Sequence, residues 1–412
     1  MFQFQSTFTS NPGLEEWLSP HSLSGNHCAK RTSPNQARLK TGNVRIPAGD
    51  FSPALKAASD GGAPGSELTS LELLAPSFPL TILAPRFKLN SAMSRNLFLG
   101  LISYLAISAS DVFGQGVQIT ELPDRLHVEI NGRLFTEYFF KNVPRPFCYP
   151  LIGPGEVAMT RNWPMKSVPD EEHDHPHHRS VWFSHGSVNG HDFWSETKSA
   201  GKIVHDGFIE VKSGKESGTI KTRNKWVAVD GTLVCTDQET LRINQTDNDK
   251  ERLFDFEITL QASDKDLVFG DTKEGTMASR LAETMRLKGK VGHGHIVNSE
   301  GVRDGATWGK RAKWCDYYGP VGDKIVGMAI FDHPENPRHP TWWHVRDYGL
   351  FAANPFGRHD FESLPDKSAG NLTVPAGKSV TFRYRFYLHA GNEQEGKVAD
   401  KYQEYVKSSA GK

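Results

Sequence analysis

The sequence predicts an all-β protein, built as a large antiparallel β-sandwich with a short C-terminal helix. Many short runs alternate apolar and polar residues, which is the pattern of a strand with one buried face. Asn-Gly and Asp-Gly pairs follow two of these runs, and such pairs favour tight hairpin turns. Only the C-terminal end has apolar residues at helical spacing. Many strands at short spacing indicate two large sheets packed face to face.

Two hairpins are expected from these turn signals. The first joins residues 126–130 to residues 134–138 through Asn131-Gly132, because both turn residues tolerate positive φ. The second joins residues 225–229 to residues 232–235 through Asp230-Gly231. Further strands are expected over residues 203–211, 218–223, 239–244, 253–262, 324–332 and 379–389.

The last of these strands and the helix after it close the predicted domain. Phe382 and Tyr384 alternate with Arg383 and Arg385, so one face of the strand is expected to be buried and the other solvated. A helix is expected over residues 397–406, where apolar residues recur at helical spacing.

The N-terminal part of the chain is expected to lie outside this domain. Residues 1–92 are rich in Ser, Pro, Gly, Asn and Ala, which predicts a disordered leader upstream of a mis-assigned start. Residues 93–114 are interpreted as a signal peptide, because Met93 and Arg95 precede the apolar run 97–107. A buried core helix or a membrane anchor is the alternative for that run. Residues 115–412 are then a single β-sandwich domain that is secreted or periplasmic.

Charge and cysteine content exclude several classes of protein. The formal net charge is +0, which gives no basic surface for nucleic acid. No stretch after residue 114 is apolar enough to span a bilayer. Cys148, Cys235 and Cys315 permit at most one disulfide in the domain. They form no CxxC pair, so a zinc ribbon or a redox dithiol is not expected.

Histidine is the residue type that indicates function. Of 17 histidines, twelve fall in three segments that contain Gly or Pro, at residues 171–194, 292–295 and 331–359. Such segments are expected to be loops, and loops on a rigid scaffold often build binding sites. Imidazole, carboxylate and guanidinium groups interleaved with Trp provide proton transfer, hydrogen bonds to hydroxyls and flat faces for a sugar ring. For any single histidine, the alternative is a structural cap or a buried hydrogen-bond partner.

Roles are assigned to residues on this basis. The general acid is expected among His177, His178 and His185, and the base is expected to be Glu274 or His333. Glu274 stands in a Gly-flanked Asp-Thr-Lys-Glu run after an apolar strand end, for which the alternative is an ordinary charged turn. The expected substrate-binding residues are Arg179, Trp182, Asp192, Arg338, His339, His344, Arg346 and Asn354.

No cofactor is expected, and a bound transition metal is the alternative. His173, His175 and His177 have period-2 spacing, which on a strand would place three imidazoles on one face. Three imidazoles suit zinc, copper or iron. Pro176 argues against a regular central strand here, and no HExxH motif supports a metal site.

Several long segments carry a family resemblance. They are residues 175–183 (HPHHRSVWF), 189–194 (NGHDFW), 313–317 (KWCDY), 332–341 (DHPENPRHPT) and 343–357 (WHVRDYGLFAANPFG). Together they resemble a bacterial family called "methane oxygenase PmoA", over roughly residues 116–391. The resemblance implies a fold similar to the galactose mutarotase supersandwich, which binds sugars in a cleft lined by His, Arg and a carboxylate. A membrane monooxygenase subunit would need several apolar spans, which residues 115–412 lack.

The function predicted from these features is acid–base chemistry on a sugar or sugar derivative by an exported protein. An epimerase, a lyase and a hydrolase all fit the residues. One alternative is a sugar-binding module without catalysis. Another is a metal enzyme of the oxygenase type that uses His173, His175 and His177. The expected partner is a carbohydrate or another small molecule, and neither nucleic acid nor a membrane span is expected.

Overall fold

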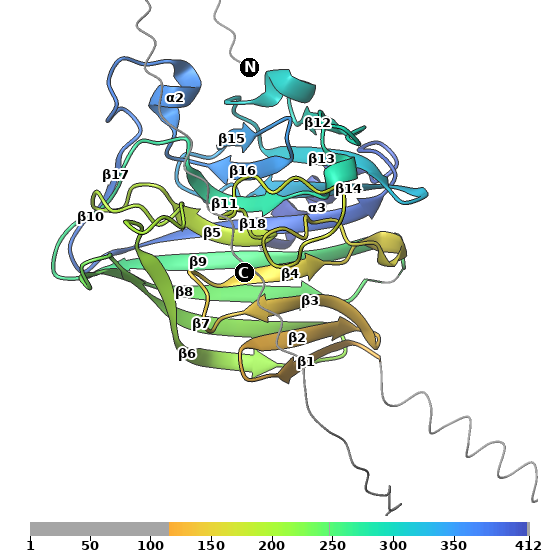
Figure 1. Ribbon diagram of the computed structural model, residues 1–412, viewed down its shortest axis with the longest axis horizontal. Coiled ribbons are helices and arrows are strands. Elements are labelled where there is room, and N and C mark those ends of the chain that lie inside the picture. The colour runs from red at the N-terminus through yellow and green to blue at the C-terminus, as the bar shows by residue number, and fades with distance from the viewer. Residues whose placement is uncertain (1–114, 247, 410–412) are drawn as a thin grey trace, which may run out of the picture. The chain divides into compact units, whose positions relative to one another are not determined.

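The computed structural model describes residues 115–246 and 248–409, which form a mostly β structure (Figure 1). The leader and the signal peptide predicted for residues 1–114 lie outside these ranges. Within the described residues, no helix is both long and apolar enough to cross a bilayer. Two large antiparallel sheets pack against each other, so the predicted all-β sandwich with a C-terminal helix is confirmed.

Each large sheet contains eight strands. The first sheet, in spatial order, consists of β1 (Val117–Glu121), β2 (Arg125–Ile130), β3 (Arg133–Phe139), β4 (Phe147–Leu151), β5 (Val181–His185), β11 (Gly275–Arg280), β16 (Leu350–Asn354) and β15 (Trp342–Val345). The second consists of β12 (His295–Asn298), β13 (Trp314–Val321), β14 (Lys324–Asp332), β18 (Ser379–Ala390), β9 (Glu251–Ala262), β8 (Leu233–Asn244), β7 (Ser217–Val227) and β6 (Lys202–Lys212).

Smaller elements connect and cover these sheets. They are the two-stranded pair β10 (Leu267–Phe269) and β17 (Leu372–Val374), the helices α2 (Arg358–Glu362) and α3 (Val398–Ser409), and 3-10 turns at Pro154–Glu156, Glu283–Met285 and Asp304–Thr307. Both predicted hairpins are present. Asn131 and Gly132 have φ of 53° and 72° between β2 and β3, and Gly231 has φ of 88° between β7 and β8.

The main core lies between the two sheets. Alternate residues of β8, β9 and β18 point into it, as their polar–apolar alternation predicts. Phe254, Phe382 and Phe386 are buried there. On the opposite face of the second sheet, Arg383 and Arg385 pair with Glu257 and Asp255 of the neighbouring strand. The predicted division of residues 379–389 into a buried and a solvated face is therefore confirmed.

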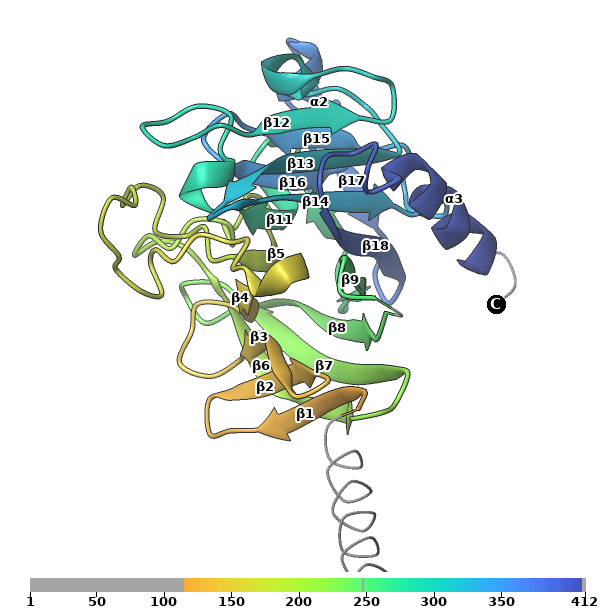
Figure 2. The ribbon, with the colours of Figure 1, turned by 90° about the vertical axis from the view of Figure 1, so that its right-hand side faces the viewer.

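Each sheet is also covered on its outer face. Helix α3 lies beside β14 and β18 (Figure 2), where Val398 and Tyr402 pack on Phe331 of the second sheet. On the outer face of the first sheet, Trp182 of β5 and Ala278 of β11 stand opposite each other in register and belong to a second apolar cluster. The loops above that cluster carry several of the predicted site residues, among them His177, His178 and Glu274.

One sequence-based expectation differs from the structure. The histidine-rich segments were expected to be loops, but residues 181–185, 342–345 and 350–354 are strands of the first sheet. These strands are covered on both faces, so they read as continuous apolar runs instead of an alternation. Among the described cysteines there is no disulfide, because Cys148, Cys235 and Cys315 are all buried free thiols.

Candidate active site

A cavity of about 340 Å³ opens on the outer face of the first sheet. It brings together two segments that are far apart in the sequence, the histidine-rich loop after residue 171 and the segment around Glu274. We call it the histidine cavity. Its lining residues are His175, His177, His178, Gly186, Asp192, Trp194, Ser195, Glu274 and Tyr348.

Two buried arginines hold the loop that forms one wall of this cavity. Arg161 donates hydrogen bonds to the carbonyl oxygens of Asp174 and His175, each at 3.0 Å. Arg280, on β11, lies 2.7 Å from Asp174 Oδ1 through Nη2. Burial raises the pKa of Asp174, but the hydrogen bond from His175 and the charges of Arg280 and Arg161 outweigh it and lower that pKa. Asp174 is therefore an ionised carboxylate with a fixed position.

His175 is oriented by that carboxylate. Its Nδ1 lies 2.8 Å from Asp174 Oδ2, so Nδ1 carries the proton and Nε2 is left as an acceptor. The ring is stacked between two others, that of His178 at 4.7 Å and that of Tyr348 at 5.1 Å between centroids. A carboxylate that fixes the tautomer of a histidine in this way is the arrangement that prepares an imidazole to accept a proton.

His178 has the opposite tautomer. Its Nδ1 accepts a hydrogen bond of 3.1 Å from Nη1 of Arg280, so the ring proton is on Nε2. That Nε2 is buried and has no hydrogen-bond partner among the described residues. Burial, with the charges of His177 and Arg280, lowers the pKa of His178 well below its usual range. The ring is therefore neutral near pH 7 and offers an N–H donor to a ligand.

His177 is also neutral and is fixed through its backbone. Burial, with the charges of Arg145 and His175, lowers its pKa to about 4. Its carbonyl oxygen accepts a hydrogen bond of 2.7 Å from Arg145 Nη2. Arg145 is buried and shares the carboxylate of Glu196 with Arg179.

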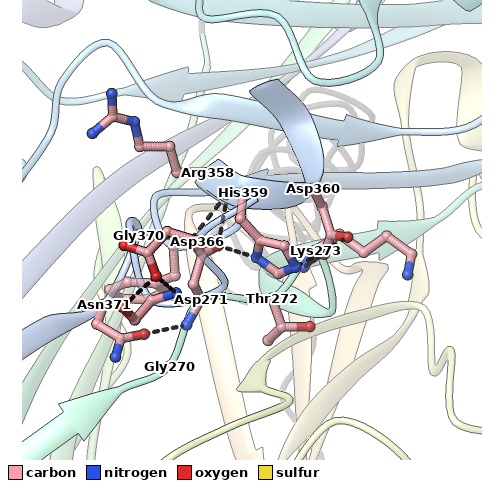
Figure 3. Close-up of polar contacts among 12 residues, drawn as sticks. Gly270, Asp271, Thr272, Lys273, Arg358, His359, Asp360, Asp366, Gly370 and Asn371 are labelled. Atoms are coloured by element: carbon pink, nitrogen blue, oxygen red, sulfur yellow. Dashed lines mark hydrogen bonds and ion pairs between the residues drawn. The ribbon is translucent and has the colours of Figure 1, made fainter. Parts of the chain in front are cut away.

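Glu274 lies across the cavity, on a segment that is anchored at its base. The Asp271 carboxylate accepts hydrogen bonds from the backbone N–H groups of His359 and Gly370, and its Oδ1 lies 2.9 Å from His359 Nδ1. Figure 3 shows Asp271 enclosed by these groups and by Asn371. This buried carboxylate therefore ties the segment 270–274 to α2 and to the loop before β17.

Two predicted substrate-binding residues support the same segment from below. His344 donates a hydrogen bond from Nδ1 to the carbonyl oxygen of Lys273, and Asn354 donates from Nδ2 to the carbonyl oxygens of Thr272 and Lys273. Both side chains are buried and neither lines the cavity. They hold the backbone of the segment that carries Glu274. The structure therefore makes them positioning residues for Glu274, in place of the substrate-binding residues expected from the sequence.

Four other predicted residues lie in the cavity or close to it. Trp182 is buried beneath His178, with ring centroids 5.4 Å apart. Arg179 pairs with Glu196. Asp192 lines the cavity, but its carboxylate accepts hydrogen bonds from the backbone and side chain of Ser195 and from Trp194 N. Arg346 does not line the cavity, but its guanidinium lies 5.5 Å from the ring of Tyr348, which does.

The remaining predicted residues lie elsewhere. His185 points into the main core, where its ring contacts Phe356 and its Nε2 donates to the Gly270 carbonyl. Burial lowers its pKa to about 4, and it does not reach the cavity as the predicted general acid. Successive side chains of β5 point to opposite faces of the first sheet. His185 therefore points to the face opposite that of Ser184, away from the cavity.

The segment that contains His333, the alternative to Glu274 as the base, also lies apart. His333 lines a different hollow, of about 570 Å³, on the outer face of the second sheet. His339 binds Asp332, with Nδ1 2.7 Å from Oδ2. Arg338 donates to three backbone carbonyl groups, among them that of Asn371 at 2.7 Å. These three residues therefore hold their own loop, and the structure does not bring them to the histidine cavity.

The triad considered for a metal does not converge. Residues 171–175 have no regular secondary structure, so the period-2 argument does not apply. His173 stacks on Trp163 at 4.1 Å, whereas His175 stacks on His178. Across residues 115–246 and 248–409, no group of three His, Cys, Asp or Glu side chains is arranged to hold a metal ion.

Sequence reasoning missed four residues of the site. His175 was considered only as a metal ligand, and Asp174, Arg280 and Tyr348 were given no role. Asp174 had a visible signal, because a carboxylate directly before a histidine can orient that ring. Arg280 is the last residue of β11, whereas Tyr348 lies between β15 and β16, and only the pairing of β11 with β16 brings them together.

Comparisons with solved structures find sugar-processing proteins at low similarity. A galactose mutarotase related enzyme from Lactobacillus acidophilus is 10% identical, with 67% of this chain and 97% of that chain covered and a TM-score of 0.23. A galactose mutarotase-like protein from Lactobacillus casei ATCC 334 is 10% identical, with 66% and 100% covered and a TM-score of 0.23. A 4-alpha-glucanotransferase from Thermococcus litoralis is 10% identical, with 68% of this chain and 38% of that chain covered and a TM-score of 0.22.

Comparisons of the sequence assign a family. A search of the curated proteins found no match. The resemblance to the family called "methane oxygenase PmoA" is wrong, because the family model that matches is a different one. That model covers residues 125–403, which include the strands of the cavity and its anchored loops. The chain therefore belongs to DUF6807, a family of unknown function.

Proposed function

We propose that the histidine cavity binds a sugar or sugar derivative and catalyses proton transfer on it. The observation that carries the proposal is the pair of stacked imidazoles with opposite tautomers, His175 and His178, in one cavity with Glu274. One ring accepts a proton and the other donates a hydrogen bond. Proton transfer at a hydroxyl or at a carbon beside a carbonyl group needs both functions.

The cavity suits a polar ring in size and in composition. Small-molecule sites have volumes of roughly 300–1,000 Å³ and combine flat apolar faces with a few polar groups. Here, Tyr348 and Trp194 contribute aromatic surface, and the indole N–H of Trp194 is buried without a partner among the described residues. Unpartnered buried donors are costly unless a ligand accepts from them, which favours an oxygen-rich ligand.

Each group has a role in the proposed reaction. His175 Nε2 accepts a proton from the sugar, and the positive charge that forms on the ring is stabilised by the Asp174 carboxylate. The Nε2–H of His178 donates a hydrogen bond to the oxygen on which negative charge develops. Glu274, across the cavity, returns a proton to the ligand from its carboxylic acid form and becomes the carboxylate, and exchange with water then resets both groups. His178 is thus an electrostatic donor in place of the general acid expected from the sequence.

The test is a turnover screen with matched variants. The full chain is assayed against sugars and oligosaccharides for epimerase, lyase and hydrolase activity. His175→Gln and Glu274→Gln are each expected to lower kcat by about 10²–10⁴-fold, the usual contribution of a general acid or base. His333→Gln is the control, because that ring lines a different hollow. Equal activity in all three variants would refute the proposed site, and sugar binding without turnover would indicate a binding module.

We also propose that the protein is exported through residues 93–114, whose apolar run follows Met93. N-terminal sequencing of the protein from culture fractions tests this. A mature N-terminus near Gln115 outside the cytoplasm is expected, and an uncleaved cytoplasmic chain would contradict export.

A further inference from the structure

The side chains around the histidine cavity carry an excess of positive charge. Six cationic side chains touch the lining residues or their direct ion partners, but only four carboxylates balance them. The cations are Arg145, Arg161, Arg179, Arg280, Arg346 and Lys273, and the carboxylates are Asp174, Asp192, Glu196 and Glu274. Two guanidinium groups share Asp174 and two share Glu196, so the walls carry two uncompensated positive charges. In a partly dehydrated cavity such an excess favours an anion.

Arg346 is the cation in this set that has no carboxylate partner among the described residues. Its guanidinium lies over two rings, that of Trp308 at 5.7 Å and that of Tyr348 at 5.5 Å. Its guanidinium donors are therefore available, in contrast to those of Arg280, which bind Asp174 and His178. Stacking on two rings also limits the conformations of the side chain, so little entropy is lost when it binds a ligand.

Tyr348 links Arg346 to the cavity. The Tyr348 ring lines the cavity, stacks on His175 and has Arg280 at 4.8 Å and Arg346 at 5.5 Å from its centroid. A ligand lying along the face of this ring would present one end to His175 and His178 and the other to Arg346. The guanidinium group is planar and matches a carboxylate with two parallel hydrogen bonds.

We infer that the ligand is a sugar acid, such as a uronate, whose carboxylate pairs with Arg346. The inference rests on the proposed function and narrows it, because a neutral sugar would leave both the Arg346 donors and the excess charge unused. Glu274 does not oppose such a ligand strongly, since Lys273 Nζ lies 3.4 Å from its carboxylate.

The experiment measures binding separately from turnover. The full chain is titrated calorimetrically with galacturonate, glucuronate and mannuronate and their short oligomers, and with the neutral sugars of the same configuration. At least one uronate is expected to bind about tenfold or more tightly than its neutral counterpart, the effect of one charge-assisted pair. That preference is expected to shrink as salt rises.

Variants of Arg346 test the contact itself. Arg346→Gln is expected to remove about tenfold of the uronate affinity with little effect on a neutral sugar, and Arg346→Lys to retain part of it. Arg311→Gln is the matched control, because Arg311 also stacks on a tryptophan, Trp342 at 4.5 Å, but binds the Pro340 carbonyl. Thermal melting verifies that the variants are folded.

The possible outcomes separate the two proposals. Neutral sugars that bind as tightly as uronates, or a uronate preference unchanged in Arg346→Gln, would overturn the sugar-acid inference and leave the proposed acid–base function standing. Absence of binding by every sugar and sugar acid would overturn both.

Discussion

His175 and His178 stack with ring centroids 4.7 Å apart and planes 10° apart, yet their partners fix the ring protons on opposite nitrogens. Asp174 accepts a hydrogen bond from Nδ1–H of His175, and Arg280 donates one to Nδ1 of His178. Asp174 and Arg280 are themselves paired at 2.7 Å. One ion pair therefore sets both tautomers, and we expect the two rings to respond together when it is disturbed.

Asp174→Asn tests this coupling. The amide cannot stabilise a positive His175 ring, and it leaves the charges of buried Arg161 and Arg280 uncompensated. We expect turnover to fall by about 10³-fold and the free energy of unfolding to fall by about 3 kcal/mol. Assays and urea denaturation measure the two effects. Asp170→Asn is the control, since Asp170 pairs with the exposed Lys290. Full activity in Asp174→Asn would show that His175 is not the base.

Gly186→Ala tests the close approach between the two walls of the cavity. A Cβ at Gly186 would lie 2.9 Å from Cβ of Glu274, which is too short unless Glu274 moves. We expect kcat to fall by about tenfold or more, because small displacements of a reacting group are costly. Gly305→Ala is the control, because a Cβ there meets nothing within 4 Å. Equal loss in both variants, or none in Gly186→Ala, would contradict the assignment of Glu274 to the site.

More of the fold than of the site could be predicted from the sequence, and particular residues show why. Arg383 and Arg385 alternate with apolar residues, and hairpins such as Asn131-Gly132 depend on local chemistry, so both follow from short stretches of sequence. The sequence does not distinguish His178 from His185. His178 precedes an apolar, Trp-containing run, and His185 belongs to one. In the structure, β5 lies between two layers. His185, on β5, points into the core, whereas His178, before β5, faces the cavity.

The partners of the site residues explain the rest. Asp174 and Arg280 are separated by about a hundred residues in the chain, and no short motif joins them. The positioning roles of His344 and Asn354 depend on backbone carbonyl groups of the loop before β11, which carry no sequence signal. The order of strands in the first sheet is therefore the information that the sequence pattern lacked.

A buried carboxylate pair gives a pH-dependent prediction away from the site. Asp237 and Glu239 lie in the main core, where Asp237 binds Asn224 and Trp226 and Glu239 accepts from Tyr138. Burial raises the pKa of Asp237 to about 6, and burial with the charge of Asp237 raises that of Glu239 well above its usual range. The folded state thus holds these protons more tightly than the unfolded state does. The contribution of Asp237 to stability is full below about pH 4 and is lost as pH rises through about 6, and that of Glu239 is lost as pH rises toward its own raised pKa.

Glu239→Gln isolates this effect. The variant keeps an acceptor for Tyr138 and removes one of the two carboxylates. We expect its free energy of unfolding, relative to the original protein, to increase by about 2 kcal/mol between pH 4 and pH 7. The difference between the two proteins is the quantity to measure, because other groups also change the stability of both over this range. His177 and His185 have lowered pKa values, so their contributions to the free energy of unfolding decrease as pH falls through the same range. A difference that is constant with pH would contradict the prediction.

The most direct test of the central claim is the tautomeric state of the two stacked imidazoles. Nitrogen-15 NMR of protein labelled at histidine, with His175→Gln and His178→Gln used for assignment, distinguishes protonated from unprotonated ring nitrogens. The account predicts a proton on Nδ1 of His175 and on Nε2 of His178 near pH 7, with the pKa of His178 well below the usual 6.5. The same tautomer in both rings, or a His178 that becomes charged near pH 6.5, would contradict it.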